Sequence, residues 1–172
     1  FVCSPPMKGQ ESQDALWAAI KAGFIDTVAT DHCPFQSYEK DWGKDDFTKI
    51  PNGCAGVENL YPYMLDAANR GKISFEKAVE LCSSNPARIF GCDSKGSICV
   101  GKDADIVIYD KEKDFTVSVT NMHSAYDHTI WEGKTFHGYP VQTYLRGQLV
   151  YDNGEFTGKP GTGKFVKRSP RA

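Results

Sequence analysis

The stretch FIDTVATDHCPF, residues 24–35, decides how the first half of the chain folds. Its β-branched residues predict a short strand over 24–30, which Pro34 prevents from continuing. Immediately upstream, a helix predicted over 12–22 has an apolar face made of Ala15, Leu16, Ala19 and Ile20. A helix that leads into a strand predicts an α/β unit, with Asp31 at the carboxyl end of the strand.

The rest of the chain changes character at Gly91. Residues 36–56 are polar and predict a long loop, of a length that is uncommon unless the loop has a function. Helices are expected at about 57–69, after the N-cap Ser74, and from Asn85. Strands are expected at 104–110, 115–119, 141–145 and 149–151, with a turn at 152–154. The sequence therefore predicts an α/β unit followed by part of a β domain, and then an extended arm at 158–172.

Composition excludes several classes of protein. The 172 residues carry 20 Lys and Arg against 22 Asp and Glu, so no basic excess would drive nucleic-acid binding. No apolar run approaches the roughly 20 residues that a membrane span needs. The six cysteines show no zinc-finger spacing and indicate free thiols in a reducing cytosol. We expect a cytoplasmic protein with no nucleic-acid or membrane partner. Because the chain starts at Phe1 as if in mid-strand, we expect it to belong to something longer.

Asp31 is the strongest candidate functional residue that the pattern alone provides. Carboxylates at the carboxyl ends of strands in α/β folds often bind metals or move protons. The alternative is an aspartate that merely turns the chain after the strand. His32 is adjacent, and a histidine beside an aspartate is more often a hydrogen-bonded packing residue than a metal ligand.

Two turn-rich segments are weaker candidates. Residues 51–56 expose backbone groups that could recognise a polar ligand, although a plain turn is the simpler interpretation. Ser4 followed by two prolines is a similar case at the start of the chain. The remaining histidines match no zinc motif and are interpreted as surface or packing residues: His123, His128 and His137.

Several motifs occur together in the order found in one enzyme family. They are FVCSPP (1–6), ATDHCPF (29–35), GKDDFTKIPNG (43–53), GVE (56–58), GSI (96–98), GKDADIV (101–107), RG (146–147) and GTGKFVKR (161–168). Over essentially its whole length the chain resembles the C-terminal portion of dihydropyrimidinases and D-hydantoinases, which are cyclic amidohydrolases of the amidohydrolase superfamily. The run over 43–53 is highly specific, whereas the run over 101–107 is shared by many amidohydrolases.

The resemblance implies an α/β fold, namely the C-terminal part of a metal-dependent hydrolase (β/α)8 barrel followed by the C-terminal strands of a composite β-sandwich. Residues 1–91 would end the barrel, with the end of strand seven at 1–4 and strand eight at 25–31. Residues 92–155 would form the sandwich segment with a loop returning to the barrel, and 156–172 the extended arm.

The resemblance also implies the hydrolytic ring opening of a cyclic amide or ureide, either a 5,6-dihydropyrimidine such as dihydrouracil or a 5-substituted hydantoin. The product would be an N-carbamoyl amino acid. Two divalent metal ions, usually zinc, would polarise the carbonyl and lower the pKa of a bridging water. Asp31 would bind a metal and shuttle a proton, while Ser4 and Asn52 would contact the substrate largely through backbone atoms. The family implies a homo-oligomer, usually a tetramer.

Other metal-binding residues of the family belong to earlier strands. The His-x-His pair, the carboxylated lysine, two further histidines and the oxyanion tyrosine have no counterpart in this sequence. We therefore expect this chain alone to be inactive, to bind no catalytic metal, and to associate or remain partly disordered in its first half. Allantoinase, dihydroorotase and the non-enzymatic dihydropyrimidinase-like binding and assembly proteins are the alternatives. The presence of Asp31 and Asn52 favours the enzyme over the last of these.

Overall fold

The structure, a computed structural model, describes residues 2–170. Five α-helices are found there, at Gln10–Ala22 (α1), Ser37–Lys40 (α2), Leu60–Asn69 (α3), Phe75–Val79 (α4) and Asn85–Ile89 (α5). The strands are Ile106–Thr116 (β1), Thr135–Leu145 (β2), Gln148–Asp152 (β3) and Glu155–Phe156 (β4). Short 3-10 turns at Asp41–Gly43, Phe47–Lys49 and Val119–Asn121 and a π-helical turn at Glu80–Ser84 complete the described elements.

The strands form one antiparallel sheet in the order β1-β2-β3-β4. Strand β1 pairs with β2 from Ile106 opposite Tyr144 to Thr116 opposite Thr135, with two irregularities in register. The β2–β3 turn has positive φ at Arg146 and Gly147, and the β3–β4 turn has positive φ at Asn153 and Gly154. Two successive positive φ angles are typical of tight hairpin turns, which confirms the turn predicted at 152–154.

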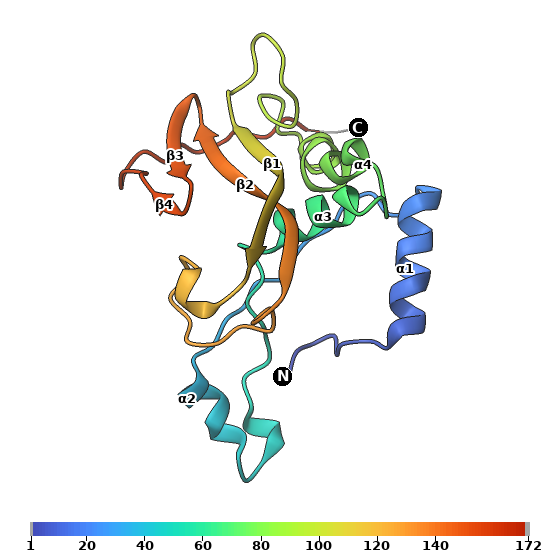
Figure 1. Cartoon of the computed structure of the whole chain (residues 1–172), viewed down its shortest axis with the longest axis vertical. Coiled ribbons are helices and arrows are strands. Elements are labelled where there is room, and N and C mark those ends of the chain that lie inside the picture. The colour runs from blue at the N-terminus through green and yellow to red at the C-terminus, as the bar shows by residue number, and fades with distance from the viewer. Residues whose placement is uncertain (1, 171–172) are drawn as a thin grey trace.

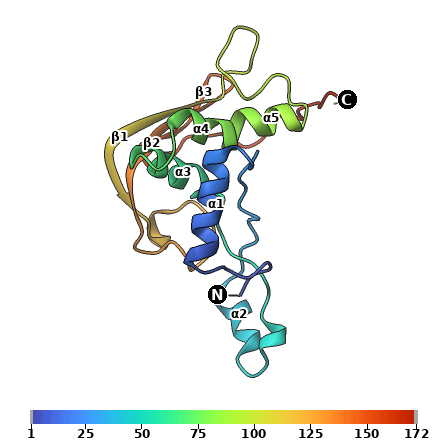
Figure 2. The same ribbon diagram turned by 90° about the vertical axis from the view of Figure 1, so that its right-hand side faces the viewer.

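The helices α1, α3 and α4 lie on one side of β1 and β2, while α2 lies on a separate arm at the far end of the molecule (Figure 1). The view after a 90° turn shows the same arrangement (Figure 2). A first apolar core joins α1, α3, α4 and the turn that follows α4, with Met64 and Leu81 almost completely buried. A second core lies on the sheet and is made of Val117, Phe136 and Tyr139. No helix among residues 2–170 is long and apolar enough to cross a membrane.

The buried carboxylate of Asp66 connects α3 with the sheet. One of its oxygens accepts a hydrogen bond from the backbone N–H of His137 on β2 at 2.7 Å. Both oxygens lie within 3.0 Å of the Arg70 Nε, one turn further along α3. The helical layer is thus fixed to the sheet by a charged hydrogen bond as well as by apolar contacts.

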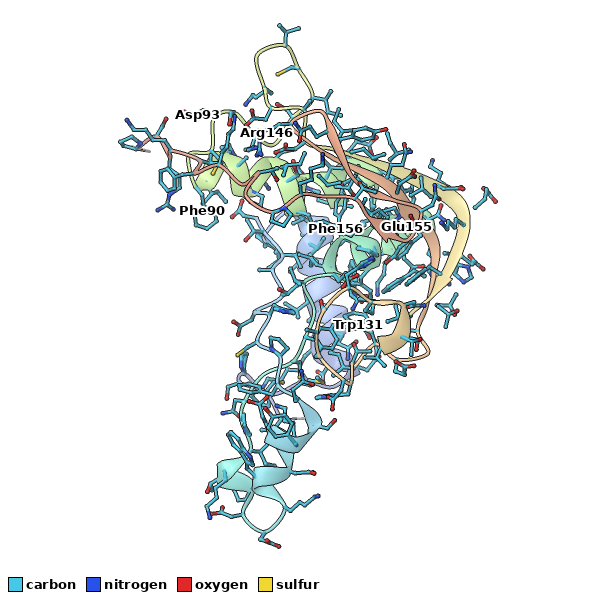
Figure 3. The ribbon with its side chains drawn as sticks, turned by 90° about the vertical axis from the view of Figure 1, so that its left-hand side faces the viewer. Phe90, Asp93, Trp131, Arg146, Glu155 and Phe156 are labelled. Atoms are coloured by element: carbon cyan, nitrogen blue, oxygen red, sulfur yellow. The ribbon has the colours of Figure 1, made fainter. Side chains whose placement is uncertain are left out.

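The segment that follows β4 runs back towards the helices. Ser169 donates its backbone N–H to the carbonyl of Gly91 at 2.9 Å, and the Arg146 guanidinium donates to the carbonyl of Thr162. Figure 3 labels Phe90, Asp93 and Arg146 around this returning segment. Residues 157–170 contain no helix or strand, so this segment is held by hydrogen bonds such as these and not by pairing in the sheet.

Local signals for helices are confirmed. Gly23 ends α1 with φ 81° and donates to the last carbonyls of the helix, as predicted for the residue after position 22. The Ser74 hydroxyl accepts from the backbone N–H of Lys77 and caps α4, and Pro86 lies in the first turn of α5.

Several predicted boundaries are wrong. Residues 24–36 form no strand, because a strand needs neighbouring strands to exchange backbone hydrogen bonds with, and none adjoins this segment among residues 2–170. The described residues 2–4 form no strand either, and residue 1 lies outside the described part. The strand predicted at 115–119 is not a separate strand: residues 115–116 end the long β1, and Val119 begins a 3-10 turn. Helix α3 begins three residues later than predicted, because Gly56 to Asn59 form a turn. The loop predicted at 36–56 contains α2 and two 3-10 turns.

Candidate functional site

Asp31 lies at the end of an extended segment that runs along the helices. Val28 in this segment donates its N–H to the carbonyl of Leu81 at 3.3 Å, and the Asn85 amide donates to the carbonyl of Asp26 at 2.9 Å. Asp31 itself is exposed and has φ 47°, a left-handed conformation that is uncommon for any residue with a side chain. Strained positions of this kind concentrate at functional sites, because surrounding contacts must hold them there.

His32 is fixed by backbone donors. Its Nδ1 atom accepts from the N–H of Gly56 at 3.0 Å and from the N–H of Val57 at 3.1 Å. A nitrogen that accepts two N–H donors carries no proton, so the ring proton resides on Nε2. This confirms the interpretation of His32 as a hydrogen-bonded packing residue, and it fixes the Asp31 segment to the turn before α3.

Backbone hydrogen bonds bring the three predicted site segments together. Gly53 donates its N–H to the carbonyl of Val2 at 3.0 Å, and Cys33 donates to the carbonyl of Cys54 at 3.1 Å. Ser4 is two residues after Val2, Asp31 two residues before Cys33, and Asn52 is the neighbour of Gly53. All three side chains are exposed. Backbone hydrogen bonds therefore join three segments that are far apart in sequence, and these segments carry the hydroxyl of Ser4, the carboxylate of Asp31 and the amide of Asn52.

Gly53 allows this junction to close. Its φ is 149°, and a Cβ atom at this position would lie 2.3 Å from the carbonyl oxygen of Cys33. No side chain fits between the two backbone segments at this point, so glycine is required at position 53.

The thiols near the junction are free. All six cysteines are unpaired, as expected from their spacing. Burial raises the pKa of the Cys54 thiol, and the neighbouring Cys3 adds to the shift. The Cys54 thiol therefore does not resemble the low-pKa thiolate of a nucleophilic cysteine.

Lys40 is a residue of this junction that the sequence pattern did not reveal. Its ammonium donates to the carbonyls of Val2 at 3.4 Å and Gly53 at 2.9 Å, and also to that of Pro51. A lysine in a polar loop has no local signature that separates it from a solvated one, so only the folded chain identifies it.

The other histidines make structural contacts. His123 Nδ1 lies 2.7 Å from a Glu58 carboxylate oxygen, and His123 Nε2 lies 3.1 Å from the carbonyl oxygen of Gly154. The Glu58 hydrogen bond is the main cause of a raised His123 pKa. His137 and His128 pair with Asp114 and Asp127 at 2.7 and 2.9 Å. These contacts confirm the interpretation of the three histidines as packing and surface residues.

A separate apolar cavity of about 410 Å³ lies between α3 and the sheet. Its lining includes Glu58, Tyr61, Tyr139, Tyr151 and Phe156, and none of Ser4, Asp31 or Asn52. Figure 3 shows Glu155 and Phe156 beside each other on β4, with Trp131 lower down in the loop between β1 and β2. The cavity is thus formed by the sheet side of the molecule and not by the junction.

The donor atoms in the described residues do not make a complete metal centre. No group of three or more His, Cys, Asp or Glu side chains within residues 2–170 is arranged to hold a metal ion. A catalytic zinc normally takes three protein ligands, and Asp31 offers one carboxylate at the junction. Any metal at Asp31 therefore needs ligands from outside these residues.

Comparison with known proteins places the chain in a family. Residues 1–150 match the model described as the amidohydrolase family. D-hydantoinase from Ralstonia pickettii is 41% identical over 171 residues, which are 98% of this chain and 37% of the relative. D-phenylhydantoinase from Escherichia coli O1:K1 is 41% identical over 173 residues, which are 99% of this chain and 38% of the relative.

Solved structures agree with the sequence comparison. The crystal structure of dihydropyrimidinase from Brevibacillus agri matches with a TM-score of 0.96 and 41% identity, covering 100% of this chain and 38% of that chain. L-hydantoinase (dihydropyrimidinase) from Arthrobacter aurescens matches with a TM-score of 0.91 and 35% identity, covering 97% of this chain and 38% of that chain. The expected resemblance and the α/β fold class are confirmed, and the chain spans less than two fifths of the length of these relatives.

Proposed function

This chain belongs to the amidohydrolase family, and we propose that the complete protein containing it opens the ring of cyclic diamides by hydrolysis. The proposed substrates are 5,6-dihydropyrimidines such as dihydrouracil or 5-substituted hydantoins, and the products are N-carbamoyl amino acids. The names of the similar proteins, D-hydantoinase, D-phenylhydantoinase and dihydropyrimidinase, support this substrate class.

The observation that carries the proposal is the junction of the Ser4, Asp31 and Asn52 segments. Two backbone hydrogen bonds, Gly53 to Val2 and Cys33 to Cys54, join three segments whose exposed side chains include one carboxylate and one amide. A cyclic diamide presents carbonyl acceptors and N–H donors on a small ring. Backbone and amide groups on a closed turn suit such a ring, because they provide both donors and acceptors in fixed positions.

Asp31 is proposed as the general base and then the general acid. Its carboxylate takes a proton from the water that attacks the ring carbonyl carbon. It returns that proton to the ring nitrogen as the C–N bond breaks, so the ring opens with the net addition of one water. Asp31 is also proposed as a metal ligand, while Ser4 and Asn52 hold the ring at attack distance.

Two divalent metal ions, which we propose to be zinc, belong to the complete protein. When bound, such ions supply Lewis-acid activation of a carbonyl and lower the pKa of water. Because Asp31 is one donor and a zinc centre needs more, the other ligands come from outside this chain. We accordingly propose that the 172-residue chain alone has no hydrolytic activity and holds no catalytic metal.

The organisation of the chain in the complete protein is part of the proposal. Residues 1–91 would complete a barrel, 92–155 would contribute to a β-sandwich, and 156–172 would form an arm. Large side chains at the surface support association with further protein: Phe24 is 81% exposed and Leu16 is 56% exposed. We propose a cytoplasmic homo-oligomer, a tetramer in its complete form.

Allantoinase and dihydroorotase are the alternative activities, since both are cyclic amidohydrolases. The experiment is to load the complete protein with zinc and measure hydrolysis of dihydrouracil, a 5-substituted hydantoin, allantoin and dihydroorotate. We expect turnover of the first two and background rates for the others. Preferential turnover of allantoin or dihydroorotate would reassign the substrate. No turnover of any of the four, together with failure of the complete protein to retain the added zinc, would favour a non-enzymatic binding protein.

A further inference from the structure

Lys40 is the last residue of α2, and its ammonium group is enclosed by backbone carbonyls. The Nζ atom donates to the carbonyls of Val2 at 3.4 Å, Gly53 at 2.9 Å and Pro51. It also lies 4.9 Å from the centre of the Phe35 ring, within the range of a cation–π contact. An ammonium has three N–H donors, so these carbonyls use its full donor capacity.

Those carbonyls belong to two of the three segments at the junction. Pro51 and Gly53 stand on either side of Asn52, and Val2 is two residues from Ser4. The Lys40 side chain therefore hydrogen-bonds to the residues on both sides of Asn52 and links this turn to the segment that carries Ser4. The direct hydrogen bond from Gly53 to Val2 runs parallel to this link.

The backbone that carries Lys40 is fixed by hydrogen bonds from α2 to the loop between β1 and β2. In α2 and its cap, the Gln36 amide donates to the carbonyl of Ala125 at 2.6 Å, and Ser37 donates its N–H to Asp127 at 2.9 Å. The Glu39 carboxylate accepts the N–H of Gln36 at 2.7 Å. Helix α2 is thus attached to the loop between β1 and β2, and the ammonium is held in place at one end of an anchored helix.

Lys44, a nearby lysine, differs from Lys40 because its ammonium lies in solvent and does not bind backbone carbonyls of residues 2–170. Lys44, one turn further along the arm, has a side chain that is 69% exposed and pairs with the exposed Asp41 at 2.8 Å. A pair of that kind contributes little, because water screens it. Carbonyl oxygens that converge on one cation repel each other when the cation is removed, so loss of Lys40 would open the turn around Asn52.

We propose that Lys40 is a positioning residue that holds the Ser4 and Asn52 segments in the geometry needed to bind the cyclic amide. The proposal rests on the proposed function for its consequence in catalysis, and on the Val2, Pro51 and Gly53 contacts for its physical basis. Lys40 acts through the two backbone segments and touches no reacting atom.

The kinetic test uses Lys40→Met, Lys40→Arg and Lys44→Met in the complete zinc-loaded protein. For Lys40→Met we expect kcat/KM for dihydrouracil or the preferred hydantoin to fall about 100-fold, mostly through a higher KM, as for a displacement near 1 Å. Lys40→Arg keeps the charge, but the N–H donors of its planar guanidinium cannot all be directed at the three carbonyls that surround one ammonium. We therefore expect an intermediate fall in kcat/KM. Lys44→Met should match the wild type. An unchanged KM in Lys40→Met with fewer active molecules would mean a merely structural role and overturn the proposal.

A second readout does not depend on turnover. Hydrogen exchange of the Gly53 amide reports the Gly53–Val2 hydrogen bond directly, and we expect at least about tenfold faster exchange in Lys40→Met than in Lys44→Met. If the wild type hydrolyses no cyclic amide, the proposed function fails, and this exchange rate still decides whether Lys40 holds the two segments. Equal Gly53 exchange in the two folded variants would overturn the proposal. If Lys40→Met does not fold, the same comparison is made with Lys40→Arg.

Discussion

Replacement of Gly53 by alanine tests whether close packing of the junction sets the geometry of the site. The added Cβ would lie 2.3 Å from the carbonyl oxygen of Cys33 and 2.8 Å from the Cys33 Cβ. Ordinary contact begins at 3.4 Å, so the Asn52 turn must retreat from the Cys33 segment by about 1 Å. The obstacle is backbone, which cannot rotate away as a flexible side chain would.

The cost follows from the conformation and from the bonds that the movement breaks. A side chain at φ 149° is strained by roughly 1–3 kcal/mol. Loss of the Gly53–Val2 hydrogen bond adds about 1 kcal/mol. We therefore expect the free energy of unfolding to fall by about 2–4 kcal/mol, since both changes accompany the same displacement. A shift near 1 Å at substrate-binding groups costs about 100-fold in kcat/KM.

The assay combines urea unfolding with turnover of a cyclic amide by the complete protein. Gly101→Ala is the matched control, because Gly101 has φ 89° and no atom within 4 Å of the added Cβ. That control carries the strain of a positive φ, about 1–2 kcal/mol, without a steric clash. Equal losses of stability in the two variants, or a Gly53→Ala enzyme with the kcat/KM of Gly101→Ala, would refute the packing argument.

Three further predictions concern stability. Phe136→Ala should lower the unfolding free energy by about 3–5 kcal/mol in a urea titration, because Phe136 is fully buried in the sheet-side core; a loss under 1 kcal/mol would show that this core is not packed. Ser74→Ala should lower the unfolding free energy by about 1 kcal/mol and reduce the helical signal, because it removes the hydroxyl that caps α4. Ser97→Ala, in an exposed bend, is the control. The pKa of His123 is raised in the folded state, mainly by Glu58, so its stabilising contribution is complete below the unfolded pKa of about 6.5 and is lost as pH rises through the folded value. The difference in stability between wild type and His123→Gln should therefore shrink from pH 6 to pH 9, and a constant difference would contradict the protonated contact.

Features with a local cause were predictable from the sequence. The Ser74 cap, the end of α1 at Gly23 and the hairpin at Asn153-Gly154 each depend on a few consecutive residues. The position of Asp31 at the end of a short extended segment was also predictable, because Pro34 limits that segment. These elements follow from side-chain and φ preferences that act within a turn.

Features with a distant cause were not predictable. The strand expected at 24–30 needs partner strands, and its backbone instead bonds to single groups such as the Leu81 carbonyl. Val2 and Gly53 meet across about 50 residues of chain, and no pattern in either segment indicates the contact. Lys40 has the sequence context of a solvated lysine, and its role depends on where three separate carbonyls converge.

The central claim is that Asp31 carries the proton in the ring-opening reaction. The direct measurement is the rate of N-carbamoyl product formation by the complete zinc-loaded protein, compared between wild type, Asp31→Asn and Asp26→Asn. Asp26 lies on the same extended segment, and its carboxylate is 69% exposed and forms a distant ion pair with Arg88 at 3.9 Å. We predict a loss of about 10³-fold in kcat for Asp31→Asn and wild-type rates for Asp26→Asn. An Asp31→Asn protein that forms product at the wild-type rate would contradict the claim.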